Sequence, residues 1–360
     1  MRDEKVKKSE VQSEECFFSV IMPIYNSEKF LRKAVNSILA QTFSNFELLL
    51  INDCSTDSCK MICNRIAEMD SRVKLLGTSV NSGAAAARNL GIKAAKGRYL
   101  GFVDSDDTID PDLFQSAYDI LKKHDYDCLK FGLQEEYYDQ TNKLKYSRKC
   151  SLDQKVYQEG NELYNQIINM EAIPLFGYLW NGFYKREIAL KNEIFMDEKL
   201  KVNEDFDFNI RYFRFVKQLC CSSSTGYHYA KRMNGSLTNQ HQEYDYEVQM
   251  MKIHRLLDFA PQKLAPMNTE RQKIFWMYVR FAYALLSDAE NDELNKIIDR
   301  IQKDSLYTEF RSTDFTNLSV KQKILIYLLK NKHKGKLKIL ILLIKKIRKK
   351  FPILFAQIKY

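Results

Sequence analysis

Residues 99–107 read Tyr99-Leu100-Gly101-Phe102-Val103-Asp104-Ser105-Asp106-Asp107, an apolar run followed at once by three carboxylates. A segment that is apolar throughout is typical of a strand buried on both faces of a sheet. Three carboxylates within four residues repel one another unless a cation or several hydrogen-bond donors compensate their charge. Oxygen ligands of this kind suit Mg²⁺ or Mn²⁺, which bind one or two carboxylates and share phosphate oxygens with a substrate. The alternative interpretation is a helix-capping turn before Asp110.

Other segments with strand character lie on both sides of this stretch: Phe17 to Ile24, Phe46 to Ile51, Arg72 to Gly77 and Asp127 to Leu133. Amphipathic segments separate them and predict helices from about Ser27, around 61–69, over Ala84 to Ala95 and over Asp112 to His124. This alternation predicts an α/β fold with a mostly parallel sheet, helices on both faces and right-handed crossovers. Ligands bind such sheets at the carboxyl ends of the strands, where the acids of 104–107 lie.

Changes in composition divide the chain into four predicted parts. We expect a disordered N-terminus at 1–15, an α/β domain at 16–242, a helical region at 243–318 and a basic amphipathic tail at 319–360. The charged N-terminus lacks the apolar segment of a secretory signal. The eight cysteines make no Cys-x-x-Cys pair, which argues against a structural zinc site and favours a reducing, cytoplasmic location.

The formal net charge of +10 on 360 residues is confined to the tail. Residues 319–360 contain thirteen Lys and Arg and no acid, so the remaining 318 residues have a net charge of −3. A nucleic-acid-binding protein needs positive charge over a folded face or along a recognition element. We therefore expect no nucleic-acid partner.

The tail predicts a helix with one apolar and one basic side. The apolar face consists of Leu337, Leu340, Ile341, Ile344 and Ile347, widened by Ile339, Leu342 and Leu343. A basic amphipathic helix of this type lies in the interface of an anionic membrane, so we expect a cytoplasmic protein that is peripheral at the inner face of the cell membrane. The alternatives are a helix packed on the protein body and an oligomer contact. The aromatic-rich segment Arg271 to Leu286 is a second candidate for a homo-oligomer contact.

Polar residues also follow the other predicted strands. Asn52 to Asp57 follows the second strand, and Asn81-Ser82-Gly83 follows the third, just before a helix that contains Arg88. Asp53 has an alternative role as a turn or helix-capping residue. A buried Arg88 needs an anionic or hydrogen-bonding partner, and a structural ion pair is its alternative role.

Four motifs in this order resemble the family 2 glycosyltransferases, whose nucleotide-sugar-binding fold is called GT-A. They are Pro23-Ile24-Tyr25-Asn26, Asn52-Asp53-Cys54-Ser55-Thr56-Asp57, Asn81-Ser82-Gly83 with Ala87-Arg88-Asn89-Leu90-Gly91, and Asp104-Ser105-Asp106-Asp107. The resemblance covers about residues 17–239 and makes 16–242 the catalytic domain. Cys54 departs from the family, which usually has glycine or another small residue there.

The resemblance implies a UDP-sugar donor and a set of nucleotide contacts: Pro23, Tyr25, Asp53, Arg88, Asp104 and Ser105. A carboxylate such as Asp53 can accept from uracil N3–H, and Arg88 can donate to a uracil carbonyl. Asp106, together with Asp104, is the implied ligand of Mn²⁺ or Mg²⁺, which would stabilise charge on the UDP leaving group. His228 is a candidate third metal ligand, with a structural histidine as the alternative.

The resemblance also implies a general base in Asn203-Glu204-Asp205-Phe206, where Asp205 takes the proton of the acceptor hydroxyl. The alternative explanation is that acids in the first turn of a helix are favoured by the helix dipole. The diphosphate and acceptor side is assigned to Trp180, Asn181, Glu204, Arg232 and Ser236. For Trp180 the alternative is a place in the core.

These assignments predict an inverting, metal-dependent transferase. It would move a hexosyl or N-acetylhexosaminyl group from a UDP-sugar to a hydroxyl of a glycan or lipid-linked acceptor, in cell-surface polysaccharide synthesis. The alternatives are a catalytically silent nucleotide-sugar-binding module and a membrane scaffold. The base contacts do not identify the sugar, and thymine presents the same edge as uracil.

Overall fold

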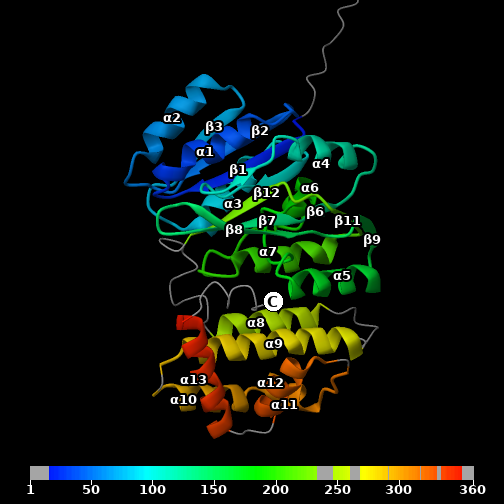
Figure 1. Cartoon of the computed structure of the whole chain (residues 1–360). Helices are drawn as coiled ribbons and strands as arrows, with labels where there is room; N and C mark the ends of the chain where they lie inside the picture. Colours follow the sequence, from blue (N-terminus) through cyan, green and yellow to red (C-terminus); the bar gives the residue numbers. More distant parts are fainter. Residues whose placement is uncertain are drawn as a thin grey trace, which may run out of the picture.

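The structure of the chain is a computed structural model that describes residues 16–232, 246–259, 268–290, 292–316, 318–330 and 334–350 (Figure 1). The predicted disorder of residues 1–15 and the predicted diphosphate ligand Ser236 lie outside these ranges. Within these ranges, no helix has the length and apolar character that crossing a membrane requires.

An eight-stranded sheet in the order β3-β2-β1-β4-β10-β6-β11-β9 forms the centre of the α/β part. Its strands are β1 (Phe18–Ile24), β2 (Phe46–Asn52), β3 (Val73–Gly77), β4 (Tyr99–Phe102), β6 (Cys128–Phe131), β9 (Lys155–Gln158), β10 (Gly182–Lys185) and β11 (Gln218–Ser222). The first four run parallel, so their carboxyl ends meet at one edge. All residues of β2 are buried, as expected for a strand covered on both faces.

Seven helices accompany these strands: α1 (Glu28–Leu39), α2 (Cys59–Met69), α3 (Ala84–Ala94), α4 (Leu113–Leu121), α5 (Asn161–Ala172), α6 (Arg186–Lys191) and α7 (Glu204–Tyr212). The helix α1 buries Leu31, Val35 and Ile38 along one side, which is the amphipathic pattern of its sequence. The helix α3 packs closely on β1, because a Cβ at Gly91 would lie 2.5 Å from a side-chain carbon of Ile21. This close packing fixes the position of the candidate site residue on α3.

A second, four-stranded sheet has the order β5-β12-β7-β8. Its strands are β5 (Thr108–Ile109), β7 (Leu133–Tyr138), β8 (Leu144–Cys150) and β12 (Tyr227–Arg232). The sequence pattern predicts neither this sheet nor β10, which runs antiparallel between β4 and β6. Because β12 pairs with β5, the second sheet lies next to the acidic residues 104–107.

The remaining described helices gather at one end of the molecule, below the α/β part in Figure 1. They are α8 (Tyr246–Asp258), α9 (Asn268–Asp288), α10 (Leu294–Lys303), α11 (Ser305–Ser312), α12 (Val320–Lys330) and α13 (Lys334–Lys350). The long helix α9 packs against α5, α8 and α13, and so connects the helical region to the α/β part. The boundary expected near residue 243 lies in an undescribed range and stays a prediction.

The apolar residues of α13 are divided between the protein body and the surface. Leu337 and Ile341 are buried, and Leu340 and Ile344 are partly buried against the core. The outer side carries exposed apolar side chains, at Ile339, Leu342, Leu343 and Ile347. Four of the eight apolar residues expected to meet a membrane therefore pack on the body, and the other four are exposed.

Candidate active site

A buried arginine, Arg88 of α3, lies at the centre of the candidate site. Its guanidinium donates to Asp104 Oδ1 at 2.9 Å, Asp205 Oδ1 at 3.0 Å and Glu204 Oε1 at 3.2 Å. Only 6% of the Arg88 side chain is exposed. Asp104 lies just beyond β4, whereas Glu204 and Asp205 begin α7. The structure thus brings four predicted site residues together, and Arg88 makes the ion pairs of its alternative role; its contact with uracil stays a prediction.

Asp205 has the environment that a general base needs. Burial raises the pKa of its carboxyl to about 7; Arg88 opposes this shift, and the charges of Glu204 and Asp104 add to it. A base with a pKa near neutrality combines an ionised form with useful proton affinity. Across the described ranges no hydrogen bond engages Asp205 Oδ2, and 17% of the side chain is exposed, which leaves this oxygen for an acceptor hydroxyl.

Asp106 is paired with Arg232 of β12. The Arg232 guanidinium donates to Asp106 Oδ2 at 2.6 Å and to the Asp106 carbonyl at 2.8 Å. Burial and the nearby charge of Asp104 raise the pKa of Asp106 to about 6, although Arg232 acts in the opposite direction. Arg232 therefore lies beside the acidic residues, where the resemblance places a diphosphate ligand.

The acids fit a divalent cation that is held by few protein ligands. Asp104 Oδ2 takes part in no hydrogen bond among the described residues, and Asp106 is held only by Arg232 through its side chain. The described part of the chain contains no group of three or more His, Cys, Asp and Glu side chains arranged around a metal position. Mg²⁺ commonly takes one or two carboxylates and fills its shell with water and phosphate oxygens, so two aspartates are sufficient.

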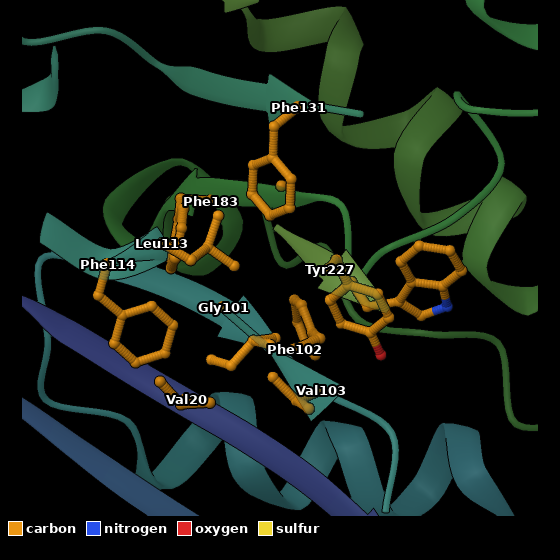
Figure 2. Close-up of a pocket in the computed structure, with 12 residues that line it drawn as sticks. Val20, Gly101, Phe102, Val103, Leu113, Phe114, Phe131, Phe183 and Tyr227 are labelled. Carbon is orange, nitrogen blue, oxygen red and sulfur yellow. The ribbon is translucent and has the colours of Figure 1, made fainter. Parts of the chain in front are cut away.

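Tyr227 connects the acidic residues to β12. Its hydroxyl donates to Asp107 Oδ2 at 2.8 Å and accepts from the backbone N–H of Asp104 at 3.2 Å. Asp107 also accepts from the Ala230 N–H at 2.8 Å, and burial raises the pKa of Asp107 well above its usual value. Figure 2 shows Tyr227 and Phe102 in the wall of an apolar cavity of about 10 Å³. A cavity of that size holds at most one water, so it is no donor pocket.

Asp53, the residue after β2, holds the loop between β3 and α3. Its Oδ1 accepts from Thr78 Oγ1 at 2.6 Å and from the Ser82 N–H at 2.9 Å, and its Oδ2 accepts from the Gly83 N–H at 2.7 Å. Gly83 has a φ of 89°, a conformation that favours glycine. The loop-closing role of Asp53 is therefore present, and its contact with uracil stays a prediction.

Three further predicted nucleotide residues lie at the carboxyl ends of neighbouring strands. Pro23 is half-buried in β1, and Tyr25 follows it with 47% of its surface exposed. Ser105 is half-buried in the turn after β4. Tyr25 is thus the exposed aromatic ring at this edge of the sheet on which a nucleotide base can stack.

Trp180 and Asn181 are buried in this structure, which corresponds to the core role given as the alternative for Trp180, and the acceptor-side role that the resemblance implies stays a prediction. Trp180 is 3% exposed, and its ring stacks on Tyr178 and Tyr227 with centroids 4.4 and 4.3 Å apart. Asn181 is fully buried and its Nδ2 donates to the Leu175 carbonyl at 2.8 Å.

His228 of β12 is held between two carboxylates. Its Nε2 lies 2.8 Å from Asp110 Oδ1, and its Nδ1 lies 2.9 Å from Glu136 Oε1. Burial disfavours the charged ring, but the hydrogen bonds to Asp110 and Glu136 outweigh it and raise the pKa of His228. Because each ring nitrogen already faces a carboxylate oxygen, neither is directed at a metal position, and the geometry corresponds to the structural alternative.

Lys130 is a buried residue of the site region that the sequence pattern did not single out. Its Nζ donates to the Tyr178 carbonyl at 2.6 Å, to Asn181 Oδ1 at 2.7 Å and to the Tyr184 hydroxyl at 2.9 Å. Burial lowers the pKa of Lys130 to about 8. The signal in the sequence is a lone lysine inside the otherwise apolar strand β6.

Comparisons with known proteins identify a family that part of this chain matches. A family model described as Glycosyl transferase family 2 matches residues 19–186. The uncharacterized glycosyltransferase EpsJ of Bacillus subtilis (strain 168) is 30% identical over 220 residues, which are 61% of this chain and 62% of EpsJ. The minor teichoic acid biosynthesis protein GgaA of the same strain is 31% identical over 221 residues, which are 60% of this chain and 47% of GgaA. The chain thus spans less than two thirds of either relative.

The fold resembles a crystal structure of S. aureus TarS 1-349 in complex with UDP-GlcNAc. The TM-score is 0.65 at 20% sequence identity, and the likeness covers 93% of this chain and 92% of that chain. At this identity the likeness concerns the fold, and it confirms the predicted α/β class with a helical C-terminal region. Residues 19–186 of this chain thus match glycosyl transferase family 2, and the aligned glycosyltransferase relatives and the shared fold agree with that match.

Proposed function

We propose that the protein is an inverting glycosyltransferase that moves a hexosyl or N-acetylhexosaminyl group from a UDP-sugar to a hydroxyl of a glycan or lipid-linked acceptor. The observation that carries this proposal is the carboxyl of Asp205, whose pKa is raised to about 7 and whose Oδ2 is free of hydrogen bonds within the described ranges. Two similar proteins support the substrate class. The structural neighbour TarS has been crystallised in complex with UDP-GlcNAc, and the aligned relative GgaA is a minor teichoic acid biosynthesis protein. We infer from these two proteins that the present protein acts in cell-surface polysaccharide synthesis.

In the proposed mechanism, Asp205 accepts the proton of the acceptor hydroxyl through Oδ2. The hydroxyl oxygen then forms a bond to the anomeric carbon of the donor while the bond from that carbon to UDP breaks on the opposite face. A single displacement of this kind inverts the anomeric configuration. Glu204 lies beside Asp205 and is the candidate for orienting the acceptor.

On the donor side, we propose that uracil lies at the carboxyl ends of β1 and β2, against Tyr25 and near Asp53, with Pro23 and Ser105 nearby. Arg232 is suited to the diphosphate because it already binds an acidic oxygen of Asp106. Asp106 and Asp104 would hold Mn²⁺ or Mg²⁺, which supplies positive charge to the diphosphate leaving group. Ser236 remains a candidate phosphate ligand outside the described ranges.

The direct test is UDP release from a panel of UDP-sugars, measured with Mn²⁺ or Mg²⁺ and with a polyol-phosphate or glycan acceptor. A transferase releases UDP from one or a few donors, and the acceptor increases the rate. A catalytically silent module would bind UDP without releasing it from any donor, and that result would contradict the proposal. Thymidine diphosphate sugars belong in the panel because the base contacts allow either pyrimidine.

We also propose that the protein is peripheral at the cytoplasmic face of the membrane, through the outer sides of α12 and α13. The apolar side chains exposed there are Val320, Ile324, Tyr327, Ile339, Leu342, Leu343 and Ile347. Exposed lysines accompany them on both helices, including Lys321, Lys323, Lys336 and Lys346. Each basic residue near anionic lipid contributes about 1 kcal/mol, so this surface suits an anionic membrane. The alternative is that the outer sides of α12 and α13 form a contact between copies of the protein.

A further inference from the structure

We propose that Arg88 is a positioning residue for the general base: it fixes the orientation of Asp205 relative to Asp104, and it does not contact the uracil ring. This inference rests on the proposed transferase function, and it changes the role that the family resemblance implies for Arg88. In this role Arg88 acts through the three carboxylates that it binds, those of Asp104, Glu204 and Asp205.

The first argument is the burial of the guanidinium. Only 6% of the Arg88 side chain is exposed, and its two terminal nitrogens donate to three carboxylates at 2.9 to 3.2 Å. The remaining Nε is buried and has no partner. With so little of the side chain exposed, a uracil carbonyl can reach the guanidinium only if the groups that cover it move.

The second argument is the way in which the carboxylate oxygens are divided. Arg88 takes one oxygen from each acid: Asp104 Oδ1, Glu204 Oε1 and Asp205 Oδ1. Among the described residues, no hydrogen bond engages the second oxygen of any of these three carboxylates. One guanidinium therefore orients all three acids and leaves each with an oxygen for a ligand: the base for an acceptor hydroxyl, and Asp104 for the donor side.

The third argument is the start of α7, where the base lies. Its N-cap residue Asn203 has a left-handed backbone with φ of 60°, and its side chain makes no capping hydrogen bond. The Nδ2 of Asn203 is buried without a partner. The ion pairs with Arg88 are thus the side-chain contacts that hold Glu204 and Asp205 at this helix terminus. They connect α7 to α3 across 116 and 117 sequence positions.

The functional test compares Arg88→Lys and Arg88→Met with the wild type. We measure the Kd of UDP by calorimetry in the presence of Mg²⁺, and kcat and KM for UDP release from UDP-GlcNAc. A displaced base predicts a kcat lower by about 100-fold in Arg88→Met, with KM and the Kd of UDP changed by less than about tenfold. Arg88→Lys keeps the charge and should recover part of the kcat. A Kd of UDP weakened by more than about tenfold with kcat preserved would show that Arg88 binds the base, and would overturn the inference.

Arg148→Met is the matched control. Arg148 also binds a buried carboxylate, Glu135 at 2.6 Å, but it lies on β8. This variant should lose thermal stability and keep kcat. An equal loss of kcat in both variants would mean that general destabilisation explains the effect, and would contradict a specific role for Arg88.

A second measurement does not depend on the donor. We compare the melting temperatures of Arg88→Met, Asp205→Asn and the double variant. If Arg88 holds Asp205, the drop in melting temperature caused by Arg88→Met becomes smaller in the Asp205→Asn background, because the unpaired buried charge is gone. Additive drops would overturn the inference even if UDP-GlcNAc is no substrate. A wild type that releases no UDP from any donor would contradict the proposed function and leave this coupling result intact.

Discussion

Arg88 Nη1 and Asp205 Oδ1 lie 3.0 Å apart, although they come from helices separated by 117 positions in the sequence. This ion pair joins α3, which packs on the parallel strands, to the first turn of α7. The same guanidinium reaches Asp104 beyond β4 at 2.9 Å. The base and the acidic residues after β4 therefore belong to one charged cluster, and the following predictions test it and its surroundings.

Activity should depend on pH through Asp205. Its pKa is raised to about 7 by burial, and the base must be ionised, so kcat should rise with pH and reach half its maximum near pH 7. Because the folded pKa lies above the unfolded value, ionisation of Asp205 weakens the fold as pH rises from about 4 to 7. A kcat that stays constant from about pH 5.5 to 8.5 would exclude a base with this pKa.

Metal binding should depend on Asp106 and not on His228. In the presence of UDP, Asp106→Asn should weaken Mn²⁺ binding by more than about tenfold, because it removes a charged ligand. His228→Gln should leave Mn²⁺ affinity unchanged, since both ring nitrogens are bound to Asp110 and Glu136. Electron paramagnetic resonance of free Mn²⁺ measures both. If both variants weaken Mn²⁺ binding equally, His228 is a metal ligand after all.

Membrane binding should depend on the outer side of α13. The double variant Ile339→Glu with Leu343→Glu removes two exposed apolar side chains and adds negative charge. Its cosedimentation with phosphatidylglycerol vesicles should fall by at least about tenfold. Met69→Glu is a matched control because Met69 is an exposed apolar residue of α2. Vesicle binding that survives, together with a change in oligomeric state on a sizing column, would identify an oligomer contact.

The buried Lys130 should contribute to stability. Lys130→Met removes three buried hydrogen bonds, one of them to Asn181 Oδ1, so the free energy of unfolding should fall by about 2–4 kcal/mol. Lys123→Met, at an exposed position of the same charge, should change it by less than about 0.5 kcal/mol. Urea unfolding measures both values. If both variants change the free energy of unfolding by the same small amount, the hydrogen bonds of Lys130 do not stabilise the fold.

The sequence predicts the parallel half of the fold well, because β1, β2 and β4 are apolar runs that are buried on both faces. It does not predict β8 or β10. The strand β8 is largely exposed and carries two lysines and an arginine, and β10 is too short to show an alternation of its own. Their positions depend on pairing with distant strands, which no local pattern encodes.

The candidate site also contains some residues whose positions the sequence predicts and others whose positions it does not. Motifs at strand ends predicted that Asp104 and the segment before the Arg88 helix meet, because the carboxyl ends of parallel strands lie at one edge of the sheet. The assignment of Asp205, at the start of α7, came from the family resemblance alone. The burial of Trp180 and the carboxylate partners of His228 depend on the second sheet, in which β12 pairs with β5 and β7. Local sequence does not show which side chains this sheet covers, so both residues were assigned to the substrate side.

The measurement that tests the central claim most directly is the transfer rate of Asp205→Asn, with Asp197→Asn as a control at an exposed acid before the same helix. The donor is the UDP-sugar with the fastest UDP release by the wild type. Removing the base should lower kcat by about 10²–10⁴-fold while the Kd of UDP stays within about tenfold of the wild-type value, and the control should keep full activity. Full transfer activity in Asp205→Asn would contradict the account.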